Sequence, residues 1–148
     1  MKQNLIDTMS VGGFLLMVAG ILLVYINHGL FSFLPIVIAV QALALLLMVW
    51  ARMTFGGRSF HFSASATEGG LVTTGPYRYI RHPIYSAALI FTWAGILANV
   101  SVRNLLFGLI TFAGAYVRML SEETLVRTKY PEYDEYAKKT WRLIPYFF

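Results

Sequence analysis

The sequence predicts an all-α integral membrane protein with about four transmembrane helices. Hydrophobic residues make up 57% of the 148 residues and charged residues only 13%, with a mean hydropathy of +0.62. This balance is too apolar for an ordinary soluble domain. In addition, several apolar runs without charges approach the roughly 20 residues that a helix needs to cross a bilayer.

The first two expected helices cover residues 9–26 and 31–50, both apolar and free of charges. The link 27–30 between them is so short that the two helices must be antiparallel neighbours. The third helix is expected over 83–100, with Pro83 in the first turn, where a helix tolerates proline. The fourth is expected over 104–121, after a tight turn at 101–103, and continues as an amphipathic helix to about residue 129.

Two further segments complete the chain. Residues 52–81 form a long polar connection with glycine pairs at 56–57 and 69–70, and a loop of this length in a compact protein is usually functional. After the fourth helix we expect a short surface helix around 132–140. The apolar residues 143–148 then lie on the membrane or cap a site.

The basic residues predict the orientation of this topology. Of the 12 Lys and Arg residues, all but Arg103 fall on one side of the expected four helices. Loops rich in Lys and Arg stay in the cytoplasm, so this side and both termini are expected to be cytoplasmic. These loops also account for the net charge of +5 without a nucleic-acid partner. The chain has no cysteine, which excludes disulfides, thiolate nucleophiles and cysteine-ligated metals.

A polar, aromatic stretch precedes the third helix, with the sequence TTGPYRYIRHPIY at 73–85. Pro83 biases His82 towards an extended backbone, and Tyr85 lies three residues further on, so both can line one edge. Taken singly, Tyr, His and Arg are common in the headgroup zone of a membrane. Their density here favours a site for a polar ligand.

A second polar cluster, Arg118 with Glu122 and Glu123, lies at the expected exit of the fourth helix from the bilayer. Arg118 and Glu122 are four residues apart and share a helix face, where a simple surface ion pair is one interpretation. Charges at this depth are costly and usually functional, which is the other.

These motifs together resemble the isoprenylcysteine carboxyl methyltransferase family, and they are similar to the phospholipid N-methyltransferases of the same superfamily. The resemblance rests on LVTTGPY at 71–77, RHPIY at 81–85, Arg118 with the Glu122-Glu123 pair, YPEYDEY at 130–136 and Pro145. It covers about 68–145. The first two helices match only as generic hydrophobic spans.

The resemblance implies a single membrane methyltransferase domain over 1–148, with an N-terminal helix pair at 1–51 and a catalytic half at 52–148. The implied cofactor is S-adenosylmethionine, in a cytoplasmic pocket formed by the 52–82 loop and the C-terminal segment. The implied cofactor contacts are Leu71, Val72, Tyr77, Arg81, His82, Pro83, Ile84, Tyr85 and Glu122. Arg118 is the implied substrate-binding residue, and no metal is implied.

The acceptor implied by the resemblance is lipophilic, in first place the carboxylate of an isoprenylcysteine-like substrate, which Arg118 would anchor. A phospholipid amine or a small thiol is the alternative. Such an acceptor must lose a proton, for which Glu122, Glu123 or His82 could serve. The catalytic candidates are therefore Arg118, Glu122 and Glu123.

Two interpretations outside this superfamily also fit parts of the sequence. Sterol reductases, which use NADPH, carry a related C-terminal pattern of aromatic residues and Arg, although no distinct basic cluster for a 2′-phosphate is visible here. A non-enzymatic small membrane protein would use the 73–85 stretch only as an interface belt. The sequence predicts membrane lipids as neighbours and gives no oligomeric state.

Overall fold

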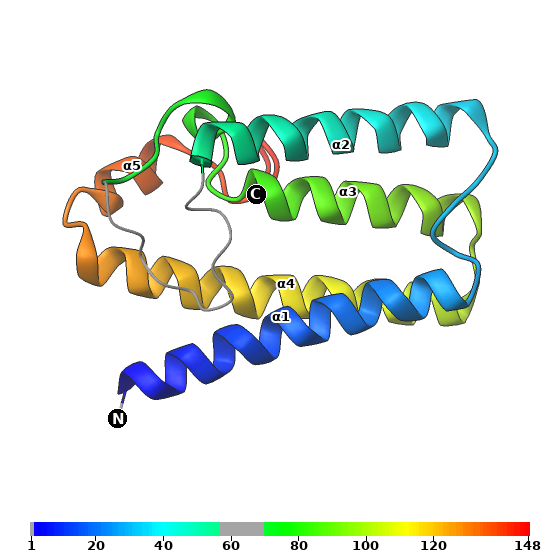
Figure 1. Ribbon diagram of the computed structural model, residues 1–148, viewed down its shortest axis with the longest axis horizontal. Coiled ribbons are helices and arrows are strands. Elements are labelled where there is room, and N and C mark those ends of the chain that lie inside the picture. Colours follow the sequence, from blue (N-terminus) through cyan, green and yellow to red (C-terminus); the bar gives the residue numbers. More distant parts are fainter. Residues whose placement is uncertain (1, 57–69) are drawn as a thin grey trace.

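The computed structural model describes residues 2–56 and 70–148, which form an all-helical bundle (Figure 1). The long helices are α1 (Lys2–Ile26), α2 (Pro35–Phe55), α3 (Pro83–Ala98) and α4 (Val102–Lys129). A short 3-10 helix, η2 (Gly75–Arg78), precedes α3, and a short helix, α5 (Tyr133–Lys139), follows α4. The described ranges contain no strand beyond one isolated bridge between Ile80 and Trp141, so the predicted all-α class is confirmed.

Three of the described helices are long and apolar enough to cross a membrane: Gln3–Ile26, Pro35–Phe55 and Val102–Lys129. The remaining long helix, α3, is apolar but has 16 residues, a length of about 24 Å. That is less than the hydrocarbon core of about 30 Å. The third expected span therefore exists as a helix, but it is short for a full crossing.

Several helix ends differ from the expected ones for local reasons. The N-terminal helix starts at Lys2 instead of residue 9, because nothing in residues 2–8 stops a helix. Helix α2 starts at Pro35 instead of 31, since a proline is favoured in the first turn and holds the preceding residue extended. The turn lies at 99–101 instead of 101–103, because Ser101 caps α4 by accepting a hydrogen bond from Asn104 N at 3.1 Å.

The bundle is built from two helix pairs, α1 with α4 and α2 with α3, and α3 also contacts α4. Glycines allow the backbones of α1 and α4 to approach closely. A Cβ atom added to Gly13 would lie 2.8 Å from the carbonyl oxygen of Gly114, whereas one added to Gly12 would meet nothing within 4 Å. The close packing of these helices therefore depends on Gly13 and Gly114, and Gly12 takes no part in it.

A buried amide joins the other pair. Gln41 of α2 is 7% exposed, and its Nε2 donates to the carbonyl oxygens of Leu30 at 2.7 Å and Phe91 at 3.2 Å. A polar group in an apolar environment is costly unless it is hydrogen-bonded. Through these two hydrogen bonds Gln41 joins α2 to the 27–34 link and to α3.

Because of the order of the helices, the segments that connect them lie at two ends of the bundle (Figure 1). Residues 27–34 and 99–101 lie at one end. The start of α3, η2, α5 and residues 140–148 lie near the other, together with the last turns of α4. The polar segments singled out in the sequence are therefore at one end, although they are far apart along the chain. Part of the expected 52–81 loop, residues 57–69, lies outside the described residues.

Candidate active site

The backbone joins the segment before α3 to the segment after α5. Arg81 N donates to the carbonyl oxygen of Trp141 at 2.7 Å, His82 N donates to that of Arg142 at 3.1 Å, and Trp141 N donates to that of Tyr79 at 3.0 Å. These bonds hold residues 79–82 and 141–142 side by side. The start of α3 is thus fixed against a segment that follows it by about 60 residues in the chain.

Pro83 begins α3, as predicted, and this determines where His82 points. Pro83 occupies the first turn, and His82 precedes it with φ −124° and ψ 57°. His82 makes no side-chain cap hydrogen bond to the helix. Its imidazole is free to face α4, where it is 8% exposed.

The Glu122 cluster, defined as Tyr85, Arg118 and Glu122, joins α3 to α4. The hydroxyl of Tyr85 donates to Glu122 Oε1 at 2.6 Å, and Arg118 Nε donates to the same oxygen at 2.9 Å. Arg118 Nε also lies 3.2 Å from the Tyr85 hydroxyl. The Glu122 side chain keeps 25% of its surface exposed, so this carboxylate remains accessible to a ligand.

Helix α1 supports the Arg118 side chain from the opposite side. Arg118 Nη1 donates to the carbonyl oxygen of Ser10 at 3.3 Å, and its guanidinium lies 5.4 Å from the centre of the Phe14 ring. Arg118 is 4% exposed. A buried guanidinium needs this kind of pairing to offset its lost hydration.

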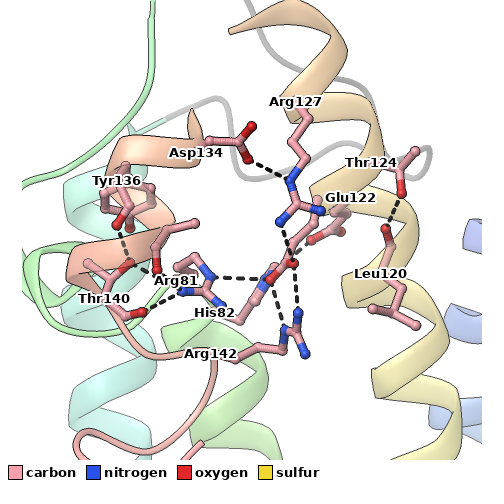
Figure 2. Close-up of polar contacts among 12 residues, drawn as sticks. Arg81, His82, Leu120, Glu122, Thr124, Arg127, Asp134, Tyr136, Thr140 and Arg142 are labelled. Atoms are coloured by element: carbon pink, nitrogen blue, oxygen red, sulfur yellow. Dashed lines mark hydrogen bonds and ion pairs between the residues drawn. The ribbon is translucent and has the colours of Figure 1, made fainter. Parts of the chain in front are cut away.

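The Glu123 cluster, defined as Arg81, His82, Glu123 and Arg142, surrounds a more deeply buried carboxylate, and Figure 2 shows its polar contacts. Arg81 Nε lies 3.2 Å from Glu123 Oε1 and His82 Nε2 lies 3.1 Å from it. Arg142 binds both carboxylate oxygens, Oε1 from Nε and Oε2 from Nη2, each at 3.0 Å. The Glu123 side chain is 1% exposed, and the hydrogen bond to it raises the pKa of the Arg142 guanidinium.

The adjacent carboxylates therefore have different surroundings, because successive helix residues point about 100° apart. Glu123 is surrounded by cations and closed to solvent, whereas Glu122 is partly open. His82 lies between them, with Nε2 at 3.1 Å from Glu123 Oε1 and Nδ1 at 3.8 Å from Glu122 Oε2. With its proton on Nε2, His82 donates to Glu123 and turns the Nδ1 lone pair towards Glu122.

Arg81 also ties this cluster to α5. Its Nη1 donates to the carbonyl oxygen of Ala137 at 2.8 Å and makes a short hydrogen bond to that of Thr140. These carbonyls stand at the C-terminal end of α5, where a cation is favourable.

The remaining predicted cofactor residues lie around η2 and the first turn of α3. Leu71, Val72 and Ile84 are half-buried, and Pro83 is buried. Tyr77 is 6% exposed and packs against Phe55, with ring centres 5.4 Å apart. Burial raises the pKa of its hydroxyl.

A cavity of about 530 Å³ opens between residues 71–78 and α5. Its described walls are Leu71, Thr73, Arg78, Glu132, Glu135, Tyr136, Lys139 and Thr140. Tyr136 also donates its hydroxyl to the carbonyl oxygen of Tyr77 at 2.6 Å, and burial raises its pKa to about 12. These walls include Leu71 but neither Tyr85 nor Glu122. In the part of the chain that the structure describes, no group of three or more His, Asp or Glu side chains could hold a metal ion.

Sequence reasoning missed the role of Arg142, which it counted only as one basic residue of a cytoplasmic face. Arg142 is the residue that binds Glu123 through both carboxylate oxygens. The sequence shows a single Arg at the start of an apolar segment, and this pattern does not indicate which residue the Arg binds. Ser86, which binds the carbonyl oxygen of Leu143 at 2.7 Å, carried no signal.

The similarity of the chain to known proteins covers most of its length. A family model described as phospholipid methyltransferase matches residues 17–133, which include both clusters except Arg142. The nickel-cobalt-cadmium resistance protein NccN of Alcaligenes xylosoxydans xylosoxydans is 32% identical over 102 residues. That alignment covers 66% of this chain and 42% of the relative, so the chain spans less than half of the relative's length. No solved structure matches the chain.

Proposed function

This chain belongs to the phospholipid methyltransferase family, and we propose that it transfers a methyl group from S-adenosylmethionine to a lipophilic acceptor at a membrane. The observation that carries the proposal is the Glu122 cluster. In this cluster the partly exposed Glu122 carboxylate, the Tyr85 hydroxyl and the Arg118 guanidinium contact one another at one end of an apolar bundle.

The described residues fit S-adenosylmethionine, which carries a sulfonium, an ammonium, a carboxylate and an adenosine. Cationic groups suit the open carboxylate of Glu122. The cavity beside α5 offers the cations Arg78 and Lys139 and the carboxylates Glu132 and Glu135. Thr140 in its wall is hydrogen-bonded to Arg81, which links this cavity to the Glu123 cluster. We assign cofactor contacts to Leu71, Val72, Tyr77, His82, Pro83, Ile84, Tyr85 and Glu122.

When bound, the cofactor supplies a methyl group that is already activated by its sulfonium, so the protein mainly has to orient the reactants and exclude water. Tyr85 and Arg118 hold the Glu122 carboxylate in one orientation. Glu123 does the same for His82. We therefore propose that Glu123 and Arg81 position His82, and that Glu122 is the carboxylate that meets the ligand.

The family description favours an amine acceptor, such as that of a phospholipid headgroup. An amine attacks as the neutral base, so its ammonium form must first give a proton to a nearby group. Glu122 Oε2 and His82 Nδ1, 3.8 Å apart, are the candidates. Glu123 is a poor candidate because its two oxygens already accept hydrogen bonds from Arg81, His82 and Arg142.

A carboxylate acceptor, as in an isoprenylcysteine-like substrate, is the second candidate, and Arg118 favours it. A carboxylate needs no base and is held best by a guanidinium. Arg118 already binds Glu122, so a substrate carboxylate would have to share or replace that contact. The two acceptor classes therefore predict different products from the same site.

We also propose that the site and both ends of the chain face the cytoplasm. Residues such as Arg52, Arg78, Lys138 and Lys139 belong to the end of the bundle that carries the site, and Arg103 belongs to the other end. The excess of positive charge marks the cytoplasmic side.

The experiment that tests the function follows the methyl group. Membranes containing the protein are incubated with methyl-labelled S-adenosylmethionine, and the lipid products are analysed by mass. We expect a labelled lipid whose mass and base stability identify a methylated amine or a methyl ester. Calorimetry of the purified protein with S-adenosylhomocysteine tests the cofactor separately, and no binding at sub-millimolar ligand would overturn the proposal.

A further inference from the structure

Residues 143–148 lie against the bundle, and Leu143 inserts into its core. Leu143 is 5% exposed and packs in a core cluster with Met17, Leu89, Ala115 and Met119. Leu89 is the seventh residue of α3, so Leu143 reaches about 9 Å below the start of that helix. Phe148 lies beside Tyr116 of α4, with ring centres 6.3 Å apart.

This level is within the membrane span expected for the fourth helix, 104–121. Tyr116 lies five residues before residue 121, a distance of about 8 Å along the helix. The segment also lies against the start of α3, whose Ser86 donates to the carbonyl oxygen of Leu143. Residues 143–148 therefore lie beside the first turns of α3, close to the expected membrane boundary.

Several backbone groups of this segment are hydrogen-bonded within the protein, as non-helical backbone in a membrane must be. Leu143 N and Ile144 N both donate to the main-chain oxygen of Phe148, at 2.7 and 2.8 Å. Phe147 N and Phe148 N donate to that of Ile144, at 3.2 and 3.0 Å. Ser86 Oγ donates to the carbonyl oxygen of Leu143 at 2.7 Å.

The side chains that this compact turn directs outwards are apolar or aromatic. Ile144 is 50% exposed, and Tyr146 and Phe147 are each 84% exposed. Tyr146 also has φ 66°, a left-handed conformation that bulky residues rarely adopt. An aromatic pair held outwards in this way gains little in water, whereas removal of the two rings from water is favourable.

From these observations we propose that residues 143–148 form a re-entrant wedge whose outer face, Ile144, Tyr146 and Phe147, contacts the acyl chains of the cytoplasmic leaflet. The partner is the lipid bilayer itself, and this inference is independent of the methyl-transfer reaction. Leu143 and Ser86 anchor the wedge to the protein, and the outer face anchors it to the membrane.

The wedge also connects the bilayer to the candidate site. Arg142 immediately precedes it, and the Arg142 guanidinium lies 5.6 Å from the centre of the Phe148 ring and 5.9 Å from that of Tyr116. The same guanidinium holds Glu123, which in turn holds His82. Lipid contact therefore stabilises residues 143–148, and these residues hold Arg142 in place beside Glu123.

Site-directed spin labelling tests this proposal without background, because the chain contains no cysteine. The variant Phe147→Cys is labelled with a nitroxide and reconstituted into phosphatidylcholine–phosphatidylglycerol vesicles. Two further variants calibrate the scale: Leu43→Cys, 65% exposed on the apolar helix α2, and Lys139→Cys, exposed on α5. Collision of the label with oxygen, which partitions into lipid, is compared with collision with a water-soluble nickel chelate.

We expect the oxygen-to-nickel collision ratio at residue 147 to approach that at residue 43 and to be several-fold higher than at residue 139. A ratio at residue 147 equal to that at residue 139 would overturn the proposal. The exposed side chain of Phe147 can be replaced without disturbing the core. Fluorescence quenching of a labelled Tyr146→Cys variant by acyl-brominated phospholipids provides a second, independent reading of the same depth.

Discussion

At the scale of single residues, the important result is the different environment of two neighbouring carboxylates. Glu122 and Glu123 look equivalent in the sequence, but one is 25% exposed and the other 1%. Their different partners give them different roles. Glu123 neutralises the buried cations around it, whereas Glu122 keeps surface for a ligand.

This difference predicts opposite phenotypes for two matched substitutions. Glu123→Gln leaves Arg81 and Arg142 without their anionic partner, and removing one member of a buried pair costs about 3–5 kcal/mol of stability. In Glu122→Gln the amide oxygen can still accept from Arg118, which also keeps its hydrogen bond to the Ser10 carbonyl oxygen, so we expect a smaller loss of stability but weak binding of S-adenosylhomocysteine. Thermal unfolding in detergent and calorimetry measure the two quantities on the same samples.

The order of the two effects is the critical outcome. If Glu122→Gln proved the less stable variant, the assignment of Glu123 as the structural carboxylate would be wrong. If Glu122→Gln bound the ligand as tightly as the unsubstituted protein, Glu122 would have no part in holding the cofactor.

At the scale of helices, close backbone contact determines how α1 supports the site. Gly13 and Gly114 let α1 and α4 approach until only backbone atoms separate them. Ser10, one turn earlier in α1, supplies the carbonyl oxygen that receives Arg118 Nη1 at 3.3 Å. The glycine contact therefore positions an acceptor for a buried guanidinium of the Glu122 cluster.

Neighbouring glycines of α1 provide a matched test of this contact. A Cβ at Gly13 would lie 2.8 Å from the Gly114 carbonyl oxygen, so Gly13→Ala forces the helices apart and should cost about 1–3 kcal/mol. Gly12→Ala meets open space and should be neutral or stabilising by less than about 1 kcal/mol. Thermal unfolding of both variants checks this, and equal melting temperatures would show that the close approach does not matter for stability.

At the scale of the whole molecule, the antiparallel order of the helices gathers the site at one end. Segments around residues 80, 120 and 141 are distant in the chain but adjacent in the fold. This arrangement requires α3 to carry the chain across the bundle despite its 16 residues. The wedge at 143–148 lies beside the first turns of that helix.

The resulting topology predicts that Arg103 and Lys138 face opposite sides of the membrane. Both residues are exposed, and single-cysteine variants at these positions can be labelled with a membrane-impermeant maleimide in sealed vesicles of known orientation. We expect Lys138→Cys to react only when the cytoplasmic face is outside, and Arg103→Cys only in the opposite orientation. Labelling of both from the same side would mean that α4, the helix between them, does not cross the membrane.

The sequence by itself determined the helical class, the approximate spans and the family-bearing motifs. Apolar runs of sufficient length become helices in a bilayer whatever their tertiary neighbours, and Pro83 and Ser101 act through their own backbone and nearby residues. The extension of α4 to Lys129 was also predictable, because a single amphipathic pattern continues across the expected membrane boundary.

Only the tertiary structure decided which polar groups meet. The contacts that distinguish Glu122 from Glu123 join residues 37 and 41 positions apart, and that of Arg118 with Ser10 joins residues 108 apart. The spacing of residues in the sequence determines which side chains are neighbours within one helix. It does not determine which side chain of another helix they contact. The same is true of residues 143–148, whose apolar composition suggested a membrane surface or a cap. The burial of Leu143 depends on its contacts with α1, α3 and α4, which the sequence does not show.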